Sequence, residues 1–442
     1  MLTEQVKSVI LIFLIALSAF LTAKLWFEER PYPVFTSRAP EEERVQMGEH
    51  KEIGELIAPD QAIISLGDDK YIALDPLFLH FQRGWQQIVA VIAESPVREG
   101  DWQAVEPPDL SAAGVWQWSF PVTLNLTQWQ ELFAREGKKN EETPVLERLI
   151  ITPEGDAFVY DGEGNYYLWH TQIALDQPLP EGLPIYQQPQ DTGNVTFDPS
   201  IYLPTTAIHL PQLVAAPEFM PAESIANTFF ADMSLVRKIH ERDGAEIFTD
   251  GQRALRIYPS GAIEYNFPGA KAKESRLQLA TAWDRGHLFV EQHGGWPDIV
   301  RVENIARKID GGEEQYHFTF RQYYNGIPVF LHQPALALSI NSSAVFLYER
   351  MVITPLYPDD VLRPVIAPQD LWEDVYAYFI EKIASAEQIT ITDLFLAYRG
   401  RQRSRREIVL EPVWVLEVNN ASQIYINAYS GAIEAFPAAG LE

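Results

Sequence analysis

The sequence predicts an α+β protein in which a single N-terminal transmembrane helix precedes a multi-domain α+β body. Three observations predict this fold. A long apolar run lies within the first 30 residues, strand-like and helix-like segments alternate through the rest of the chain, and the pentapeptide Ser-Gly-Ala-Ile-Glu occurs twice. With 442 residues the chain can build two to three domains with their own cores.

Composition excludes several classes of protein. Hydrophobic residues make up 47% and charged residues 21% of the chain, which is typical of a globular protein. The formal net charge of −27 argues against nucleic acid as a partner and against adhesion of the body to an anionic membrane. The absence of cysteine excludes disulfides, zinc–thiolate sites, cysteine nucleophiles and a lipoprotein acyl anchor.

The apolar run Ser8–Phe27 predicts a transmembrane helix, because it has the length needed to cross a bilayer and Lys24 is its only charge. Lys24 lies near the end of the run beside Trp26, where both can reach the headgroups. The small-x-small triplet 16–18 lies in the middle of the run, which favours an uncleaved anchor over a signal peptide. We expect a cytoplasmic stub over residues 1–7, the transmembrane helix over 8–27 and a juxtamembrane stalk over 28–55.

Flanking charges are too balanced to orient the anchor by the positive-inside rule. The short N-terminal tail and the large acidic body favour a cytoplasmic N-terminus, with the bulk of the chain outside the cell membrane.

Residues 56–175 predict an N-terminal α+β domain. A hairpin is expected around Gly67-Asp68-Asp69, and Asp75-Pro76 is a good helix start. Thr127 with Gln130 predicts a capping box for a second helix, with Gly137 at its end. The apolar residues that follow Asp75-Pro76 at helical spacing are Phe78, Phe81, Trp85, Ile88, Val89 and Ile92.

Residues 176–221 contain nine of the 31 prolines and predict an extended connector without a regular helix or a central strand. Residues 222–442 predict two related α+β halves, about 222–350 and 351–442. Each half has a helix, then strands, then the pentapeptide. The expected helix faces are Ile225, Phe229, Met233, Val236 and Ile239 in the first half, and Leu371, Val375, Phe379 and Ile383 in the second.

The repeated pentapeptide predicts a turn rather than a catalytic site. In the first copy, Tyr258-Pro259-Ser260-Gly261 has Pro at the second turn position and Gly at the fourth, which suits a type I turn. Alternating residues follow each copy, so each is expected at the tip of a β-hairpin. Glu264 and Glu434 should then lie on the solvent side.

No catalytic or cofactor motif is present, and we expect neither an enzyme nor a bound cofactor or metal. The chain lacks nucleophile-elbow, zinc-protease, P-loop and dinucleotide-binding patterns. His287 and His293 are six residues apart, a spacing that favours surface or capping roles over metal ligation. With 61 carboxylates, chance proximity of an acidic pair is expected and indicates nothing.

Two features could contact a partner. An arginine-rich stretch in this acidic chain is either a solvated hairpin loop or a contact for an acidic protein surface, wall teichoic acid phosphates or lipid headgroups. Small residues in the anchor are either a feature of an ordinary span or a surface for close helix packing. The stretch contains Arg399, Arg401, Arg403, Arg405 and Arg406, and the anchor residues are Ala16, Ser18, Ala19, Thr22, Ala23 and Trp26.

Three segments resemble the YycH family. They are the anchor "VKSVILIFLIALSAFLTAKLW", the stretch "QYYNGIPVF" over 322–330, and "PVWVLEVNNASQIYINAYSGAIEAF" over 412–436. The last also resembles the closing module of YycI and, more loosely, PepSY-type domains. The resemblance covers the anchor, the length and the C-terminal third.

The resemblance implies a single-pass membrane accessory of the WalK/WalR (YycG/YycF) two-component system of Gram-positive bacteria. It implies regulation of the WalK sensor kinase together with YycI, through transmembrane helices and extracytoplasmic domains, and thereby of cell-wall metabolism. Whether the effect is activation or repression does not follow, and a homo- or heterodimer stays open. The alternatives are a membrane-anchored module that binds a wall polymer or peptide, and a PepSY-like protease inhibitor.

Overall fold

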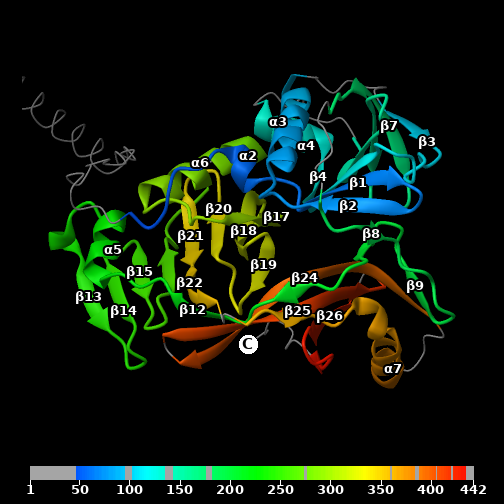
Figure 1. Cartoon of the computed structure of the whole chain (residues 1–442). Helices are drawn as coiled ribbons and strands as arrows, with labels where there is room; N and C mark the ends of the chain where they lie inside the picture. Colours follow the sequence, from blue (N-terminus) through cyan, green and yellow to red (C-terminus); the bar gives the residue numbers. More distant parts are fainter. Residues whose placement is uncertain are drawn as a thin grey trace, which may run out of the picture.

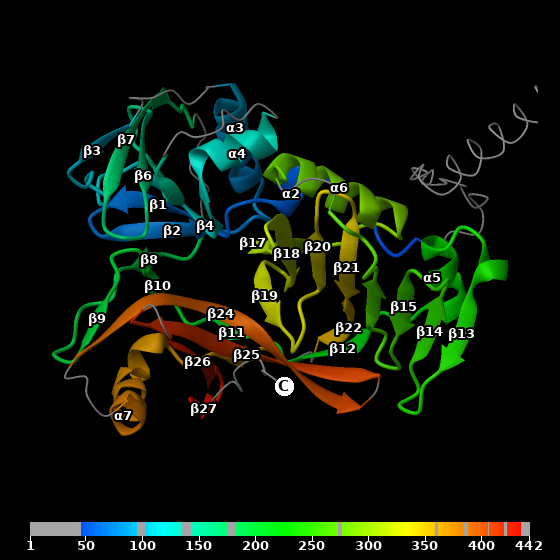
Figure 2. The same ribbon diagram turned by 180° about the vertical axis from the view of Figure 1, so that it is seen from behind.

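The computed structural model describes residues 46–94, 102–134, 143–175, 182–272, 276–358, 361–383, 388–404, 406–419 and 422–434. These residues form a mixed α+β body that is mostly β-sheet. We divide it into a first lobe (residues 53–172), a central lobe (222–358) and a C-terminal unit (372–434). Figures 1 and 2 show helices on the outer sides of the sheets, with α7 on the side of the C-terminal unit away from the other lobes.

The first lobe is built on antiparallel strands, joined by two connector strands into a sheet of order β10-β8-β2-β1-β4-β5-β6-β7-β3. The predicted hairpin is confirmed: Gly67, Asp68 and Asp69 all have positive φ between β1 and β2. The bounds are α2 Ile53–Leu56, β1 Gln61–Gly67, β2 Lys70–Leu74, α3 Leu79–Glu94, β3 Trp102–Val105, β4 Trp116–Asn125, α4 Leu126–Phe133, β5 Val145–Ile151, β6 Asp156–Tyr160 and β7 Tyr166–Gln172.

The predicted apolar face of α3 is confirmed, because Phe81, Trp85, Ile88 and Ile92 are buried. The capping box of α4 lies two residues earlier than predicted. The Asn125 side chain accepts from the Gln128 backbone, and the Gln128 side chain accepts from the Asn125 backbone, both at 2.9 Å. Thr127 instead contacts the Thr143 hydroxyl at 3.2 Å. The buried residues of α3 are Phe81, Gly84, Trp85, Ile88 and Ile92.

The proline-rich segment is extended, but the prediction that it forms no central strand is wrong. Strand β12 pairs with β25 on one side and β22 on the other. It can do so because Leu213–Ala215, which pair with β25, are free of proline, while Pro211 and Pro217 flank them. The connector strands are β8 Tyr186–Gln187, β9 Val195–Phe197, β10 Leu203–Pro204, β11 His209–Leu210 and β12 Leu213–Pro217.

The central lobe contains two helix-and-strand successions. Within the described residues its main sheet runs β13-β14-β15-β16-β21-β20-β18, with β17 also paired to β18. The bounds are α5 Ala222–Phe229, η2 Met233–Leu235, β13 Arg237–His240, β14 Glu246–Thr249, β15 Ala254–Ile257, β16 Ile263–Asn266, α6 Leu279–Gln292, β17 Val300–Asp310, β18 Glu313–Tyr324, β19 Ile327–Phe330, β20 Leu336–Ile340, β21 Val345–Arg350 and β22 Ile353–Pro358.

The helix predicted to run as far as Ile239 is wrong beyond Phe229. Asp232 caps a short 3-10 turn by accepting from the Ser234 backbone, and β13 follows. Strand pairing with β14 therefore overrides the helical spacing. Ile239, assigned to the buried face, is 48% exposed.

The C-terminal unit packs α7 against a twisted antiparallel sheet of order β24-β25-β26-β27. Leu371 and Val375 are buried there, as predicted. The predicted Phe379 and Ile383 lie within α7, but their side chains are outside the described set. The bounds are β23 Arg363–Pro364, η3 Pro368–Asp370, α7 Trp372–Ile383, β24 Ile389–Ser404, β25 Glu407–Val418, β26 Ser422–Asn427 and β27 Ile433–Glu434.

Both copies of the pentapeptide lie at hairpin turns, as predicted. Gly261, between β15 and β16, has φ +84°, and Gly431, between β26 and β27, has φ +72°. In both places a helix is followed by four antiparallel strands in sequential order, with the turn before the fourth strand. Helix α6 also precedes such a succession, β17-β18-β20-β21, whose last turn is 341–344.

The hydrophobic cores divide the body differently from the sheets. One continuous core joins the first lobe to the central lobe, from Trp118 and Trp129 to Trp296 and Phe320. The C-terminal unit has its own core around Val375, together with connector residues. Two smaller clusters join the C-terminal unit to the central lobe: one contains Val329, Tyr398 and Leu410, and the other packs Phe330 with Phe395 against Tyr425.

Candidate functional site: the anchor entry and the lobe junction

The predicted transmembrane contacts lie outside the described residues; they are Ala16, Ser18, Ala19, Thr22, Ala23 and Trp26. No helix in the described part of the chain is long and apolar enough to span a membrane.

The first described segment, residues 46–52, is fastened to the body, and we call it the entry segment. The Met47 amide donates to the Gly294 carbonyl at 2.7 Å, and Glu49 and Trp296 exchange two backbone hydrogen bonds at 2.8 and 2.9 Å. Gly48 makes this approach possible, because a Cβ there would lie 1.9 Å from the Trp296 carbonyl oxygen. The chain therefore enters the body along the α6–β17 loop.

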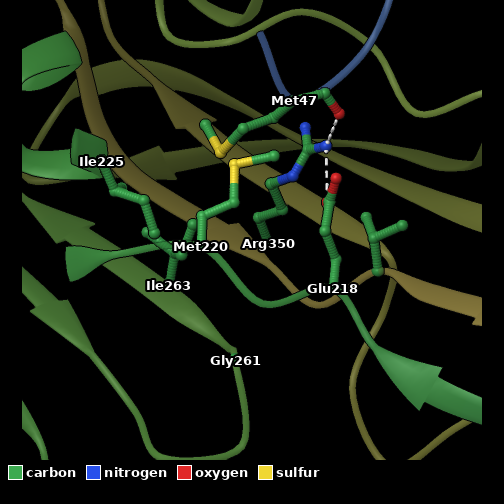
Figure 3. A pocket seen from close by; sticks show the side chains of 8 residues that line it. Met47, Glu218, Met220, Ile225, Gly261, Ile263 and Arg350 are labelled. Carbon is green, nitrogen blue, oxygen red and sulfur yellow. Dashed lines mark hydrogen bonds and ion pairs between the residues drawn. The ribbon is translucent and has the colours of Figure 1, made fainter. Parts of the chain in front are cut away.

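The Arg350 side chain holds the entry segment by hydrogen bonding to the Met47 carbonyl (Figure 3). Its side chain is 2% exposed and pairs with the Glu218 carboxylate at 3.0 Å. One guanidinium nitrogen donates to the Met47 carbonyl, and another donates to the Gly295 carbonyl at 2.9 Å. A buried arginine with three acceptors fixes the position of the groups it binds, because its planar guanidinium must donate hydrogen bonds to all three at once. We call this arrangement the entry latch.

A small pocket beside the entry latch is open to solvent and has a volume of about 10 Å³, roughly enough for one water molecule. The first pentapeptide lies against it, since a Cβ on Gly261 would come 2.5 Å from the Glu218 backbone oxygen. The pocket is lined by Met47, Glu218, Met220, Ile225, Gly261, Ile263, Arg350 and Val352.

Histidines also fasten the entry segment. His50 pairs with Glu291 at 3.2 Å, and hydrogen bonds to Glu291 and Glu52 raise the pKa of His50. The His287 ring bonds the Lys51 carbonyl at 2.7 Å. His293 is the C-cap residue of α6 and bonds the Phe289 carbonyl at 2.6 Å.

The predicted capping role is confirmed for His293, whereas His287 lies within α6 and binds the entry segment instead. Among the described residues, no group of three or more His, Asp or Glu side chains could hold a metal ion.

The arginine cluster lies at the far end of the β24–β25 hairpin, and much of its charge is already paired. Arg401 and Arg403 are exposed, as predicted, and Arg403 lies 3.7 Å from Glu407. Arg399 is not exposed: it bonds the Glu434 carboxylate of the second pentapeptide at 2.5 Å.

Arg401 binds the same carboxylate and lies 3.7 Å from Glu411. Arg406 is exposed in the turn, and Arg405 lies outside the described residues.

A third site lies where the first lobe, the central lobe and the C-terminal unit meet. The Tyr323 hydroxyl donates to the Asp60 carboxylate, 3.1 Å away. Arg301 is buried, lies 4.8 Å from the Tyr323 ring centre, and has one guanidinium nitrogen without a hydrogen-bond partner within the protein. Loss of hydration between the packed lobes raises the pKa of Asp60 to about 6 and, with neighbouring carboxylates, that of Asp393 to about 7, although both residues keep exposed surface. We call these residues the lobe junction.

Sequence reasoning missed both the entry latch and the lobe junction. Their members are far apart in the chain: Arg350 and Met47 are separated by 303 residues, and Tyr323 and Asp60 by 263. The one available signal was Gly294-Gly295, where both residues have positive φ after the end of α6.

Comparison with known proteins gives one family match. Residues 198–429, just over half of the chain, match the family model described as YycH protein, C-terminal domain. No curated protein matches the chain.

Solved structures give a fold match. The crystal structure of YycH from Bacillus subtilis is similar with a TM-score of 0.56 and 13% identity, covering 86% of this chain and 98% of that one. Weaker likenesses are an uncharacterized protein from Eubacterium rectale (TM-score 0.39, 10% identity, 57% and 94% covered) and the Bacillus megaterium YpeB C-terminal domain (TM-score 0.29, 13% identity, 49% and 97% covered).

Proposed function

Because the chain belongs to the YycH family, we propose that it is a membrane-anchored accessory protein that regulates the WalK sensor kinase together with YycI. The family as a whole serves two-component regulation, and the partners named here come from that membership. The anchor would be the span Ser8–Phe27, with the body outside the cytoplasm and cell-wall metabolism as the regulated process.

The entry latch is the observation that best supports this function. A protein that only needed to be held at the membrane could use a free linker between span and body. Here residues 46–52, which were predicted to belong to the stalk, are instead bonded through backbone and Arg350 to the central lobe. We propose that this attachment passes a change in the body on toward the span, and the reverse.

A double substitution in the span tests regulation through the membrane. Ala19→Ile with Ala23→Ile enlarges two small residues, which should hold a partner helix away while leaving the span apolar. We expect a normal amount of protein at the membrane and altered transcription of the kinase's wall-metabolism targets. The matched control, Leu11→Ile with Leu21→Ile, keeps side-chain size and should leave transcription unchanged. Full regulation by the Ala19/Ala23 variant would contradict contact through the span.

A glycine pair tests the role of the entry latch. Gly48→Val would place a side chain against the Trp296 carbonyl and break the backbone pairing. We expect the variant to remain membrane-bound and to lose regulation. Gly193→Val is the control, because a Cβ at Gly193 meets nothing within 4 Å. Co-purification of the kinase and YycI from membranes shows whether complex formation or only signalling is lost. Recovery of a glycan or a protease in their place would favour the alternative functions.

A further inference from the structure

Two of the chain's five methionines lie together where the entry segment contacts the body. Met47 belongs to the entry segment and is 5% exposed, whereas Met220 lies just before α5 and is partly exposed. Both line the water-sized pocket beside the entry latch, and Figure 3 shows their thioethers directed into it. A small solute can therefore approach Met220, while the body covers Met47.

The Met47 side chain is closely fitted to the body. A Cβ at Gly294 would come within 2.3 Å of the Met47 methyl carbon, so glycine is needed at this position. Met47 is part of the core that joins the first and central lobes, and Met220 packs against that core. Ile225 and Ile263 make other walls of the pocket apolar. The entry segment is thus held by an apolar contact as well as by hydrogen bonds.

One donor of the Arg350 guanidinium is unused. Its other nitrogens bind the Glu218 carboxylate and the carbonyls of Met47 and Gly295. The buried Nε atom has no hydrogen-bond partner in the described part of the chain. A thioether sulfur is only a weak acceptor. A strong acceptor on the pocket wall would therefore compete with the Met47 carbonyl for the same arginine side chain.

We propose that Met220 is an oxidation site and that its conversion to the sulfoxide releases the entry segment. The oxidant is a peroxide. With hydrogen peroxide, a sulfur lone pair attacks one oxygen, and an S–O bond forms as the O–O bond breaks. The other oxygen leaves as hydroxide and takes the proton of the transferred oxygen, which gives water. Sulfur loses two electrons and the peroxide gains them.

The sulfoxide weakens the attachment of the entry segment in two ways. It places a polar oxygen among the apolar side chains that hold Met47. It also offers Arg350 an acceptor other than the Met47 carbonyl. Methionine sulfoxide reductases return the sulfoxide to the thioether, so the release is reversible. Its consequence for kinase regulation rests on the function proposed above, whereas the release itself concerns only this chain.

Hydrogen exchange measures the attachment directly. The Met47 and Glu49 amides donate to carbonyls of the α6–β17 loop, so their exchange with solvent depends on opening of the entry segment. In the full chain in lipid nanodiscs, hydrogen peroxide should oxidise Met220 and speed exchange in residues 46–52 about tenfold, which corresponds to about 1.4 kcal/mol. Methionine sulfoxide reductase with dithiothreitol should restore slow exchange. The thiol is harmless to this chain, which has no cysteine.

Three variants separate the sulfur from its surroundings. Met220→Leu keeps the size and apolar character of the side chain, so exchange should be slow with or without peroxide. Met220→Gln carries a polar oxygen and should exchange fast without peroxide. Met233→Leu removes another partly exposed methionine that does not line the pocket, and this control should respond to peroxide like the parent.

Mass spectrometry of the peptide that contains Met220 gives the extent of its oxidation in each sample. Unchanged or slower exchange in residues 46–52 after Met220 is oxidised would overturn the proposal, as would fast exchange in peroxide-treated Met220→Leu. Oxidation of Met233 without oxidation of Met220 would also overturn it, because the site would then be closed to peroxide. These results are independent of contact between transmembrane spans, which the span variants test.

Discussion

The unit formed by α5 with β13–β16 and the unit formed by α7 with β24–β27 contain the same pentapeptide at the same turn, yet use it differently. In the first, Gly261 presses against the Glu218 backbone beside the entry latch. In the second, a Cβ on Gly431 would meet only the side chains of Leu371 and Ile366. A five-residue sequence thus determines the turn, and the residues packed against it determine its role.

The glutamates of the two copies differ in the same way. Glu264 accepts a hydrogen bond from the neighbouring Tyr258 hydroxyl at 2.7 Å, a contact within the hairpin. Glu434 binds Arg399 and Arg401 from a different strand. The first unit therefore satisfies its glutamate locally, and the second uses it to fasten the β24–β25 hairpin.

Removing the buried arginine of the entry latch should have the largest effect. Arg350→Met leaves the Glu218 charge and the Met47 and Gly295 carbonyls without their donor. We expect the free energy of unfolding to fall by about 3–5 kcal/mol, measured by urea denaturation. Arg399→Met in the second unit should lower it by about 1 kcal/mol or less, because Glu434 is partly exposed and keeps Arg401. Equal decreases in the free energy of unfolding would show that the two arginines contribute equally to the stability of their units.

The two glycines give the next largest difference. An alanine at either position must adopt a left-handed conformation, which costs about 1–2 kcal/mol. Gly261→Ala adds a clash with the Glu218 backbone, whereas Gly431→Ala meets a side chain at 3.3 Å that can move. We expect Gly261→Ala to lower the midpoint of thermal unfolding more than Gly431→Ala. A larger decrease for Gly431→Ala would mean that the contacts beside the entry latch accommodate a Cβ more easily than the packing under α7 does.

The two units should also differ in how salt changes the stability lost when their glutamates are substituted. Glu264→Gln and Glu434→Gln should each lower the free energy of unfolding by about 1 kcal/mol. Salt screens the partly exposed ion pairs of Glu434 more than the hydrogen bond of Glu264 within its hairpin, so the loss at Glu434 should shrink at high salt and the loss at Glu264 should not. Urea denaturation at two salt concentrations measures both. Parallel salt dependence would contradict the difference in their partners.

The smallest effect is expected at the tip of the second unit. Arg403→Ala removes an exposed side chain 3.7 Å from Glu407, and stability should change by less than about 0.5 kcal/mol. If the arginine cluster contacts an anionic partner, reversal of Arg401, Arg403 and Arg405 to Glu should weaken that binding, most strongly at low salt. Unchanged binding and signalling would leave the cluster as a solvated hairpin end.

Local sequence predicted the parts of the fold that local physics determines. The Gly67 hairpin, the apolar face of α3 and both pentapeptide turns depend on neighbouring residues, and all were found where expected. The helix across Met233–Ile239 failed because the spacing of its apolar residues suits a helix, while pairing with β14 requires a strand. Strand β12 was missed because proline content was averaged over a segment whose proline-free centre could pair.

The candidate sites were beyond prediction for a different reason. Arg350, Glu218 and Met47 have no common motif, and each is unremarkable among its sequence neighbours. Asp60 and Asp393 were two of 61 carboxylates until the fold brought them within electrostatic reach of each other at the lobe junction. The arginines stood out as a run of charge, but their pairing with Glu434 and Glu411 depends on the register of β24 and β27 against β25 and β26.

The separation of 303 residues between Met47 and Arg350 also bears on the order of assembly. A chain made from its N-terminus would place its predicted membrane span long before the residues that grip the entry segment emerge. Until Arg350 and the α6–β17 loop are present, the growing body can rotate freely about its attachment. Closing so long a loop loses chain entropy, so the grip should form only after the central lobe has folded. A product that stops short of residue 350 would then be held at the membrane without a fixed orientation.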